Sequence, residues 1–467
     1  MRINFKLFSK IEFWLIFFFV IRLYGITNPP LETGHNWRQS DVLMAARNFY
    51  ETDSNIFYPR NDLTDGKSGI TGMEFPLLNY LIYLVSLLFG YNHWYGRLIN
   101  LIFSFFGTYY FFLIIRDFIN KKTAFYSAIL LCCSLWFAHS RKAIPDIFAV
   151  SMVMAGLYYG LCYIIKNKSY HHLLAYTILI LFGILSKISA GYLLVIPLIL
   201  LFNKNYPANR KVYMSLLTSA VLFCVWAWYF YWVPHLNNTF GIQRFFMGVS
   251  CITGLKGLIQ NMGETLKKFY ETALMYSGFA VFLTGIYYMI KRKNSLLGMI
   301  CVACFLSFSI FILKSGQNFS IHSYYILVFI PVMALIAGYG IAEINKNNLG
   351  TVLVVIVCLE NIINQQHDFY IRKDKLEVLQ LESDLDKSCS RAELIAINSD
   401  GNPTPMYLAH RKGWAPSNSY LVNKDYISEI RQKGCRYVVV FKKNFGCNND
   451  LDFPKIFEND TYKIYKL

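Results

Sequence analysis

Charged residues are scarce in this chain of 467 residues. Only 16% are Asp, Glu, Lys or Arg, whereas 55% are hydrophobic, and typical soluble domains carry about 25% charged residues. The shortage excludes an ordinary soluble enzyme. Apolar runs such as 11–20, 98–115 and 351–358 recur up to about residue 363. The composition therefore predicts a polytopic membrane protein.

The chain also lacks an internal repeat, a low-complexity segment and a clustered basic face. Its net charge of +17 comes from Lys and Arg in short stretches between apolar runs, whereas a nucleic-acid-binding protein gathers them on one polar surface. We therefore expect no nucleic-acid partner. Cytoplasmic loops retain Lys and Arg, which predicts a cytoplasmic N-terminus. The predicted inner basic residues are Arg2, Lys6, Lys10, Arg116, Lys121, Lys122, Lys166, Lys168, Lys204, Arg210, Lys211, Lys291, Arg292, Lys293 and Lys346.

Cysteine patterns of metal or redox sites are missing too. Cys301 and Cys304 form a CxxC without a histidine or a second pair nearby, so a metal or redox role is not expected. Cys389, Cys435 and Cys447 lie in the polar tail, where one disulfide is compatible with an extracytoplasmic location. No small-residue cleavage site follows the first apolar segment, which is therefore predicted to be a retained span.

A membrane-crossing helix needs about 20 mostly apolar residues, and by this criterion we expect eleven spans. The run 76–89 is shorter, begins with a proline suited to a first helical turn and is predicted to lie along the membrane surface. The odd number of spans then places the tail outside. The predicted spans are 11–26, 97–115, 124–138, 147–165, 171–186, 188–202, 212–233, 269–290, 295–313, 324–342 and 349–363.

The predicted fold class is an all-α polytopic membrane protein with a small C-terminal extracytoplasmic α/β domain. The transmembrane domain would cover 1–363, with a long first outer loop at 27–96, and the soluble domain 364–467. In the tail, helical patterns at 375–386 and 425–433 alternate with apolar, strand-like runs at 394–398 and 436–442. The inner loops are brief, so the functional site is expected on the outer face.

Three carboxylates in these outer segments are the catalytic candidates. Asp41 has helical spacing to Ala45 and Asn48, so it is predicted near the start of a short surface helix, where the dipole stabilises its ionised form. Arg38, one turn earlier, is expected to depress its pKa. Glu74 and Asp146 are further candidates, although either is also compatible with a helix cap. Asp41 is also compatible with a helix carboxylate that has no chemical task.

Basic residues accompany these carboxylates in the outer segments. A mixed-charge cluster at one membrane depth suits an anionic head group that is held while a hydroxyl is deprotonated. Lys187 is also compatible with a side chain that only snorkels to the interface, and Trp37 with a membrane anchor instead of a sugar platform. The cations are Arg38, Arg141, Lys142, Lys187 and Arg244.

Several strings resemble bacterial glycosyltransferase family 39, a GT-C family related to protein O-mannosyltransferases and to the aminoarabinose transferases that modify lipid A. They are HNWRQSD at 35–41, AARNFY at 45–50, EFPL at 74–77 and GRL at 96–98. Residues 141–146 resemble the second acidic outer-loop motif, 185–187 a Thr/Ser-Lys turn, and 322–325 followed by Pro331 the start of a late span. The similarity covers about 10–345.

The resemblance implies a glycosyltransferase of the bacterial plasma membrane that acts in cell-envelope glycan synthesis or modification. A sugar would pass, with inversion, from a polyprenyl-phosphate carrier to a hydroxyl on the extracytoplasmic face. By carry-over, Asp41 is the general base or acceptor-orienting group and Asp146 assists it. The substrate-binding candidates are His35, Trp37, Arg38, Gln39, Arg141, Lys142, Lys187, Arg244, His322 and Tyr324.

The sequence departs from the mannosyltransferase pattern at one point. Those relatives carry an adjacent Asp-Glu pair, whereas Val42 follows Asp41 here, so neither a mannosyl donor nor a protein acceptor is expected as a matter of course. A divalent metal stays open, because relatives differ. A flippase or transporter, or a polymerase or ligase of lipid-linked glycans, are the alternatives. A transporter would show repeated halves and broken helices with midplane polar residues, and a polymerase or ligase resembles the chain less.

Overall fold

The structure, a computed structural model, describes residues 8–344, 348–443, 445–447 and 450–467. Arg2, Lys6 and Lys346, which the topology prediction uses, lie outside these ranges. The chain divides into two compact units. Unit 1 comprises Met1–Ile26, Arg97–Trp228 and Phe246–Gln366, and unit 2 comprises Thr27–Gly96, Tyr229–Phe245 and His367–Leu467.

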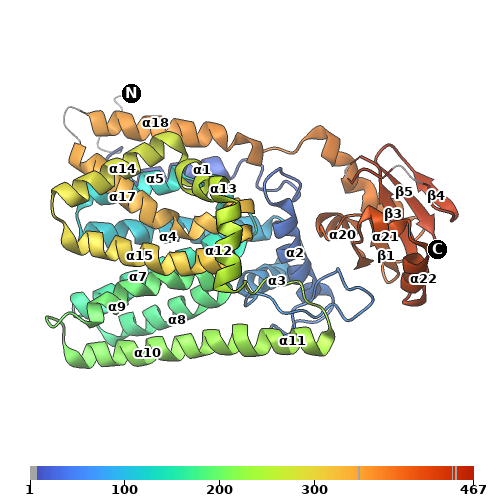
Figure 1. The fold of residues 1–467 in the computed structure, drawn as a ribbon, viewed down its shortest axis with the longest axis horizontal. Coiled ribbons are helices and arrows are strands. Elements are labelled where there is room, and N and C mark those ends of the chain that lie inside the picture. The colour runs from blue at the N-terminus through green and yellow to red at the C-terminus, as the bar shows by residue number, and fades with distance from the viewer. Residues whose placement is uncertain (1–7, 345–347, 444, 448–449) are drawn as a thin grey trace. The chain divides into compact units, whose positions relative to one another are not determined.

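Unit 1 is helical, as the apolar runs predict, and its longer helices run side by side in Figure 1. Short 3-10 and π segments continue several of them, and helices α12 and α13 follow one another after α11. Its elements are α1 (Ile11–Arg22), α4 (Tyr95–Phe118), α5 (Lys121–Cys133), α6 (Trp136–His139), α7 (Pro145–Ile165), α8 (Tyr170–Ser186), η1 (Ile188–Leu194), α9 (Val195–Leu201), α10 (Ala208–Trp226), η2 (Ala227–Trp232), α12 (Cys251–Gln260), α13 (Met262–Lys267), η3 (Lys268–Ala273), α14 (Met275–Lys291), α15 (Ser295–Ser315), α16 (Gln317–Ile321), η4 (Ser323–Phe329), α17 (Ile330–Ile344) and α18 (Leu349–Asn364).

Five helices of the described chain are long and apolar enough to cross a membrane, or seven if each of two bent helix pairs counts as one span. The predicted multi-pass membrane class is thus confirmed. Each of the eleven predicted spans falls on helical structure. Helix α3 (Leu77–Phe89) has 13 residues, a length of about 20 Å, which is shorter than the roughly 30 Å hydrocarbon layer.

Helices α7 and α8 are antiparallel neighbours, and glycine permits their close approach. A Cβ atom on Gly183 of α8 would lie 2.7 Å from a methyl group of Val153 on α7. Small residues let membrane helices pack backbone to backbone in this way. Because the two helices are antiparallel, the start of α7, with Asp146, lies beside the turn that follows α8, with Lys187.

Unit 2 joins the first long loop to the C-terminal tail. The loop contributes α2 (Asn36–Glu51) and α3, and the tail contributes η6 (Lys373–Gln380), α19 (Leu381–Asp386), α20 (Thr404–Ala409), α21 (Asn418–Leu421) and α22 (Lys424–Gln432) around one sheet. Helix α11 (Val233–Phe240) and the short η5 (Gln366–Asp368) complete the described elements.

The C-terminal sheet is mixed and confirms the predicted α/β pattern. Its order is β2-β1-β3-β5-β4, with β1 parallel to β2 and β3 and β5 antiparallel to β3 and β4. Strand β3 is buried over most of its length, as its apolar run predicts. The strands are β1 (Leu394–Ile397), β2 (Lys412–Trp414), β3 (Cys435–Phe441), β4 (Lys455–Glu458) and β5 (Tyr462–Lys466).

The tail cysteines are not paired with one another. Cys389, Cys435 and Cys447 are buried free thiols. The Cys389 thiol lies 3.4 Å from the Ser390 carbonyl oxygen, and that of Cys435 lies 3.4 Å from the Tyr437 carbonyl oxygen. The structure therefore contains none of the disulfides that the tail sequence permits.

Candidate active site

Helix α2 carries the string that singled out Asp41. His35 precedes the helix in the left-handed conformation, with φ 57°, and Asn36 begins it. Asp41 is therefore in the second turn, beyond the first turn where the helix dipole acts. Most residues from Gln39 to Phe49 are buried, so the prediction of a surface helix with a dipole-stabilised Asp41 at its start is wrong. The hydrophobic residues that follow Asp41 pack inward and draw the helix into unit 2.

Asp41 is held by a neutral partner. The side-chain amide of Asn61 donates a hydrogen bond of 3.1 Å to its Oδ1, and Asp41 takes part in no ion pair within the described residues. Burial raises the pKa of Asp41, against the lowering effects of Arg38, the Asn61 hydrogen bond and Arg244. Arg38 therefore lowers the pKa of Asp41, as predicted, but the loss of hydration on burial is the larger effect and the net shift is upward.

Arg38 pairs with a different carboxylate. Its guanidinium donates a short hydrogen bond to Glu74, and both side chains are largely buried. Glu74 is not a helix cap, because Pro76 occupies the N-cap position of α3. Gln39, on the next position of α2, lies 3.5 Å from Glu32. Arg38, Asp41 and Glu74 thus lie close enough within unit 2 to influence one another electrostatically.

The other candidates of unit 2 differ in their surroundings. Arg244 forms an ion pair of 3.0 Å with Asp65 and donates a hydrogen bond to the Leu63 carbonyl oxygen. It is close enough to Asp41 to lower its pKa. His35 and Trp37 are half-buried at the start of α2, where the Trp37 backbone N–H donates to the Asn36 side chain.

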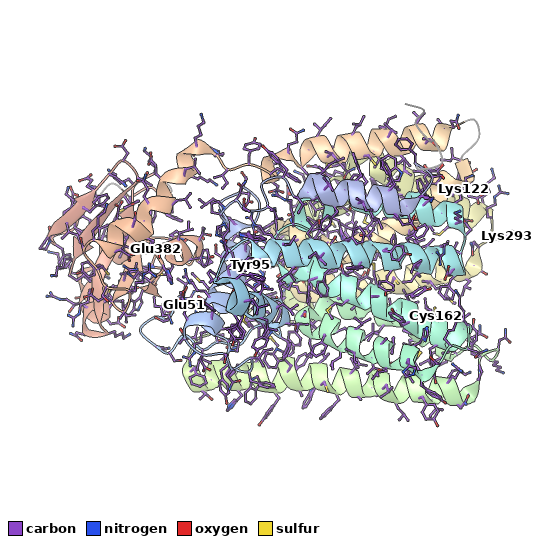
Figure 2. All side chains as sticks on the ribbon, turned by 180° about the vertical axis from the view of Figure 1, so that it is seen from behind. Glu51, Tyr95, Lys122, Cys162, Lys293 and Glu382 are labelled. Carbon is purple, nitrogen blue, oxygen red and sulfur yellow. The ribbon has the colours of Figure 1, made fainter. Side chains whose placement is uncertain are left out.

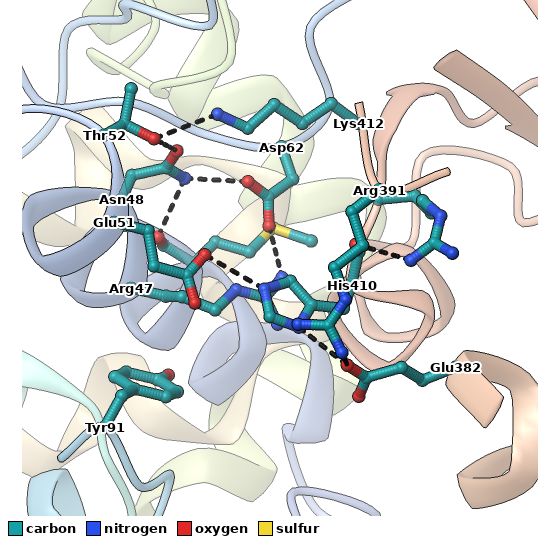
Figure 3. Close-up of polar contacts among 12 residues, drawn as sticks. Arg47, Asn48, Glu51, Thr52, Asp62, Tyr91, Glu382, Arg391, His410 and Lys412 are labelled. Carbon is teal, nitrogen blue, oxygen red and sulfur yellow. Dashed lines mark hydrogen bonds and ion pairs between the residues drawn. The ribbon is translucent and has the colours of Figure 1, made fainter. Parts of the chain in front are cut away.

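Helix α2 is fixed at its other end by a buried network that the sequence analysis missed (Figure 3). The carboxylate of Asp62 accepts a 2.7 Å hydrogen bond from Arg47 and another of 2.7 Å from Asn48. Arg47 also donates to the Tyr407 carbonyl oxygen. Asp62 directly follows Asn61, so this network also holds the amide that contacts Asp41. Arg47 and Asn48 lie in the AARNFY string, but their partner Asp62 is 14 or more positions away, so no string marks the network as a whole.

The backbone after Asp62 continues into the sheet of unit 2. The N–H of Gly413 in β2 donates to the Asp62 carbonyl oxygen at 3.0 Å, and the Asp65 N–H donates to that of Gly413 at 3.1 Å. A Cβ atom on Gly413 would lie 1.9 Å from the Ile395 carbonyl oxygen. Glycine is required at this position because β1 and β2 approach so closely.

A histidine bridges two glutamates near the same network (Figure 3). His410 contacts Glu382 at 2.8 Å and Glu51, the last residue of α2, at 3.0 Å. The hydrogen bond with Glu382 and then that with Glu51 raise the pKa of His410, against a lowering by burial and by Arg47. The C-terminal domain therefore contacts α2 through a histidine whose pKa is raised above its usual value by two glutamates.

Unit 1 holds the second acidic candidate. Asp146 is in the first turn of α7 and is not its N-cap, which is Ile144. Its side chain is 1% exposed and forms an ion pair of 3.5 Å with Lys187. The Lys187 ammonium also lies 5.7 Å from the centre of the Tyr324 ring. The structure therefore brings together Asp146 from the start of α7, Lys187 from the end of α8 and Tyr324 from the start of η4.

The remaining cations of unit 1 are buried against backbone. Arg141 donates to the carbonyl oxygens of Arg22 at 3.0 Å and Tyr24 at 2.6 Å, just after α1. Lys142 is likewise buried. His322 is stacked on the Tyr324 ring, with 5.3 Å between ring centres. Arg141 thus satisfies helix-end carbonyls, a structural task that its sequence position did not predict.

In the part of the chain that the structure describes, no set of side chains is arranged to bind a metal ion. No three side chains of His, Cys, Asp or Glu converge there in a manner that would hold an ion. The arrangement instead offers a carboxylate of raised pKa in unit 2 and a buried carboxylate-lysine pair in unit 1. A raised carboxylate pKa favours proton acceptance, and a lysine favours anion binding.

Comparison with known proteins identifies the domain. Residues 74–230 match the family described as dolichyl-phosphate-mannose-protein mannosyltransferase. The matched range includes Glu74, Asp146 and Lys187. This part of the chain is similar to a membrane glycosyltransferase family. The resemblance to family 39 in the sequence is thereby confirmed. Curated protein sequences give no match.

Solved structures agree with the GT-C assignment at the level of the fold. ArnT from Cupriavidus metallidurans bound to undecaprenyl phosphate superposes with a TM-score of 0.62 at 11% identity, over 97% of this chain and 98% of that one. Its apo form gives 0.60 at 12% identity, over 97% of both chains. The oligosaccharyltransferase AglB from Archaeoglobus fulgidus, in complex with an inhibitory peptide and a dolichol-phosphate, gives 0.57 at 13% identity, over 92% of this chain and 69% of that one. The likeness in fold to ArnT thus extends over the C-terminal part of this chain.

Proposed function

We propose that the protein transfers a sugar from a polyprenyl-phosphate carrier to a hydroxyl acceptor, with inversion, in cell-envelope glycan synthesis or modification. The observation that carries the proposal is the end-to-end likeness to ArnT, whose structure contains undecaprenyl phosphate. AglB, with a bound dolichol-phosphate, belongs to the same group of folds. A polyprenyl-phosphate donor accounts for both neighbours.

Asp41 is the proposed general base. In an inverting transfer the acceptor oxygen forms a bond to the anomeric carbon while the bond from that carbon to the carrier phosphate breaks. The hydroxyl proton passes to the Asp41 carboxylate, and the phosphate leaves as an anion. Because burial raises the pKa of Asp41, its carboxylate is a stronger base than a hydrated one, and Asn61 fixes one of its oxygens.

The carrier phosphate is proposed to contact Lys187 and Arg244. Charge-assisted hydrogen bonds from lysine or arginine are the usual way to hold a phosphate. Both cations now pair with carboxylates, Asp146 and Asp65, so each partner keeps a cation in place until an anion competes for it. Asp146 is proposed to orient Lys187 in addition to assisting the acceptor.

The proposed topology has eleven spans, a cytoplasmic N-terminus and an extracytoplasmic active site, in a bacterial plasma membrane. The transmembrane domain would end near residue 363 and the extracytoplasmic domain would follow. Figure 2 supports the charge argument within unit 1, because Lys122 and Lys293 lie at the same end of its helices. Reporter fusions after Arg116 and after Asn364 should give inside and outside signals, and the opposite pair would refute this topology.

Turnover of a defined donor tests the function itself. The purified protein is incubated with undecaprenyl-phosphate sugars and a mixture of lipid and glycan acceptors, and free carrier phosphate is measured. We expect release only when donor and acceptor are both present. Vesicles that move the intact lipid-linked sugar across the bilayer without releasing phosphate would instead identify a flippase. The glycan missing from cells without the protein would name the sugar and the acceptor.

A further inference from the structure

A large apolar groove lies in unit 1, and none of its lining residues is a candidate site residue. It has a volume of about 830 Å³. One wall is formed by Phe279, Phe282, Ile286 and Met289 of α14, which are three or four residues apart and share one helix face. The opposite wall comes from α15 at 295, 298, 302 and 305, and the floor from 329 and 336. Residues 266, 269 and 270 of α13 and η3 complete the lining, so the groove is an apolar hollow beside two neighbouring helices.

Two glycines show why the protein itself leaves this groove open. On the inner side, a Cβ atom at Gly285 of α14 would lie 2.0 Å from the Ile336 carbonyl oxygen, so α14 and α17 are in backbone contact. On the groove side, a Cβ atom at Gly298 of α15 would meet no heavy atom within 4 Å. Gly298 therefore leaves open space in the α15 wall of the groove, although no neighbouring backbone requires a glycine there. Gly285, in contrast, is needed for the close contact of α14 with α17.

The groove has the length of one membrane leaflet. From Ser295 to Phe305 the α15 wall rises ten residues, which is about 15 Å at 1.5 Å per residue. Half of a roughly 30 Å hydrocarbon layer is also about 15 Å. A single acyl chain that enters at the Ser295 end therefore fits the wall from the membrane surface to the midplane.

Tyr270 lines the groove near Phe279, at the start of α14, but the charged lining residue lies at the Ser295 end. Lys293, Asn294 and Ser295 lie there, and Figure 2 places Lys293 at the end of the helices. Its two basic neighbours are occupied, because Arg292 pairs with Glu343 at 2.8 Å and Lys291 stacks on Tyr287. Lys293 is exposed and forms no ion pair among the described residues. An anion at the mouth of the groove would therefore meet an available ammonium group.

We propose that this groove binds one acyl chain of an anionic phospholipid, with its phosphate on Lys293. Basic residues between membrane helices recognise anionic head groups in this manner, and the apolar walls bury the chain. The occupant is taken as a phospholipid and not the polyprenyl carrier, because the charged end and the one-leaflet length fit a lipid of the leaflet at Lys293. The proposal is independent of the proposed reaction.

Native mass spectrometry of the full-length purified protein tests this site. The protein is supplied with phosphatidylglycerol or with phosphatidylcholine of the same chains. Wild-type protein should retain one phosphatidylglycerol in preference to phosphatidylcholine. Gly298→Trp, which fills the groove, should lower that retention by tenfold or more, and the smaller Gly298→Leu should lower it less. Lys293→Gln should lose roughly a fivefold preference for the anionic lipid, as expected for one lysine at a membrane surface.

Leu306→Trp provides the matched control. Leu306 lies on the same helix, is 60% exposed and does not line the groove, so this variant should retain lipid as the wild type does. Equal retention by Gly298→Trp and Leu306→Trp, both monodisperse by size exclusion, would overturn the proposal. Undecaprenyl phosphate is added as a competitor. If it replaces phosphatidylglycerol and is itself lost in Gly298→Trp, the groove binds the carrier and the phospholipid assignment is wrong.

Discussion

Asp41 in unit 2 and Asp146 in unit 1 are both acidic residues near the starts of helices, yet their surroundings differ in kind. Asp41 accepts a hydrogen bond from the neutral amide of Asn61, and Asp146 forms an ion pair with Lys187. A neutral donor leaves a carboxylate able to accept a proton, whereas a paired lysine stabilises its charge. The difference supports the proposal that Asp41 accepts the proton and that Asp146 positions a cation.

Exchange of each carboxylate for its amide tests the comparison most severely. A positioned base contributes roughly 10² to 10⁴ in rate, so Asp41→Asn should nearly abolish transfer although it preserves the side-chain shape. Asp146→Asn should leave more activity, because it removes a partner of Lys187 and not the base. Turnover is measured with polyprenyl-phosphate sugar at equal membrane expression. Wild-type turnover in Asp41→Asn, or loss confined to Asp146→Asn, would reverse the two roles.

Removal of the lysine should weaken donor binding and spare the base. A charge-assisted contact contributes roughly 1.5 to 3 kcal/mol, so Lys187→Ala should raise the donor Kd by about tenfold to a hundredfold. It also leaves Asp146 without its cation, which destabilises the fold. The double variant Lys187→Ala/Asp146→Asn should regain thermal stability but not donor affinity. Unchanged affinity in both Lys187→Ala and Arg244→Ala would show that other groups bind the phosphate.

Loss of the Asn61 amide should shift the pH dependence of sugar transfer, because it acts on Asp41. The Asn61 hydrogen bond lowers the pKa of Asp41, so Asn61→Ala should raise that pKa further. The base is active when ionised. The acidic limb of the kcat/KM profile should therefore move to higher pH, with a loss of about tenfold in rate per pH unit of displacement on that limb. Asn55→Ala, in an exposed turn, is the control, and coincident acidic limbs would show that Asn61 does not tune the base.

The smallest expected effect concerns the contact of His410 with Glu51 of α2. Because its folded pKa is raised by Glu382 and Glu51, protonated His410 stabilises unit 2 fully below its unfolded pKa of about 6.5, and this stabilisation is lost as pH rises through the folded pKa. Glu51, Glu382, Arg391 and Arg47 are the charges around it. His410→Gln should flatten the thermal stability of the full chain between pH 6 and pH 9.

Half-exposed ion pairs contribute roughly 0.2 to 1 kcal/mol, so the His410 effect should amount to a few degrees at most. His171→Gln, at an exposed histidine of unit 1, is its control. An unchanged pH dependence in His410→Gln would show that protonation of His410 does not affect the stability of unit 2.

The helices were predictable because a helix in a membrane must be apolar along its own length. Each of the eleven predicted spans contains helix, and five to seven helices of the described chain are long and apolar enough to cross a membrane. The alternating tail patterns correspond to the strands β1 and β3. The position of Asp41 within its helix was not predictable to the turn. The sequence offers no cap at His35, yet α2 begins directly after it at Asn36, so Asp41 lies in the second turn, beyond the reach of the helix dipole.

The sequence by itself determined the class of this protein, the location of its helices and the identity of its candidate carboxylates. These follow from composition and short strings, which act through local hydropathy and spacing. Only the tertiary structure decided that Asn61 faces Asp41, that Arg47 and Asp62 hold that segment, and that Lys187 pairs with Asp146. Such contacts join residues that are 15 to 41 positions apart, and no local propensity fixes them, because they form only when buried polar groups must find partners across packed elements.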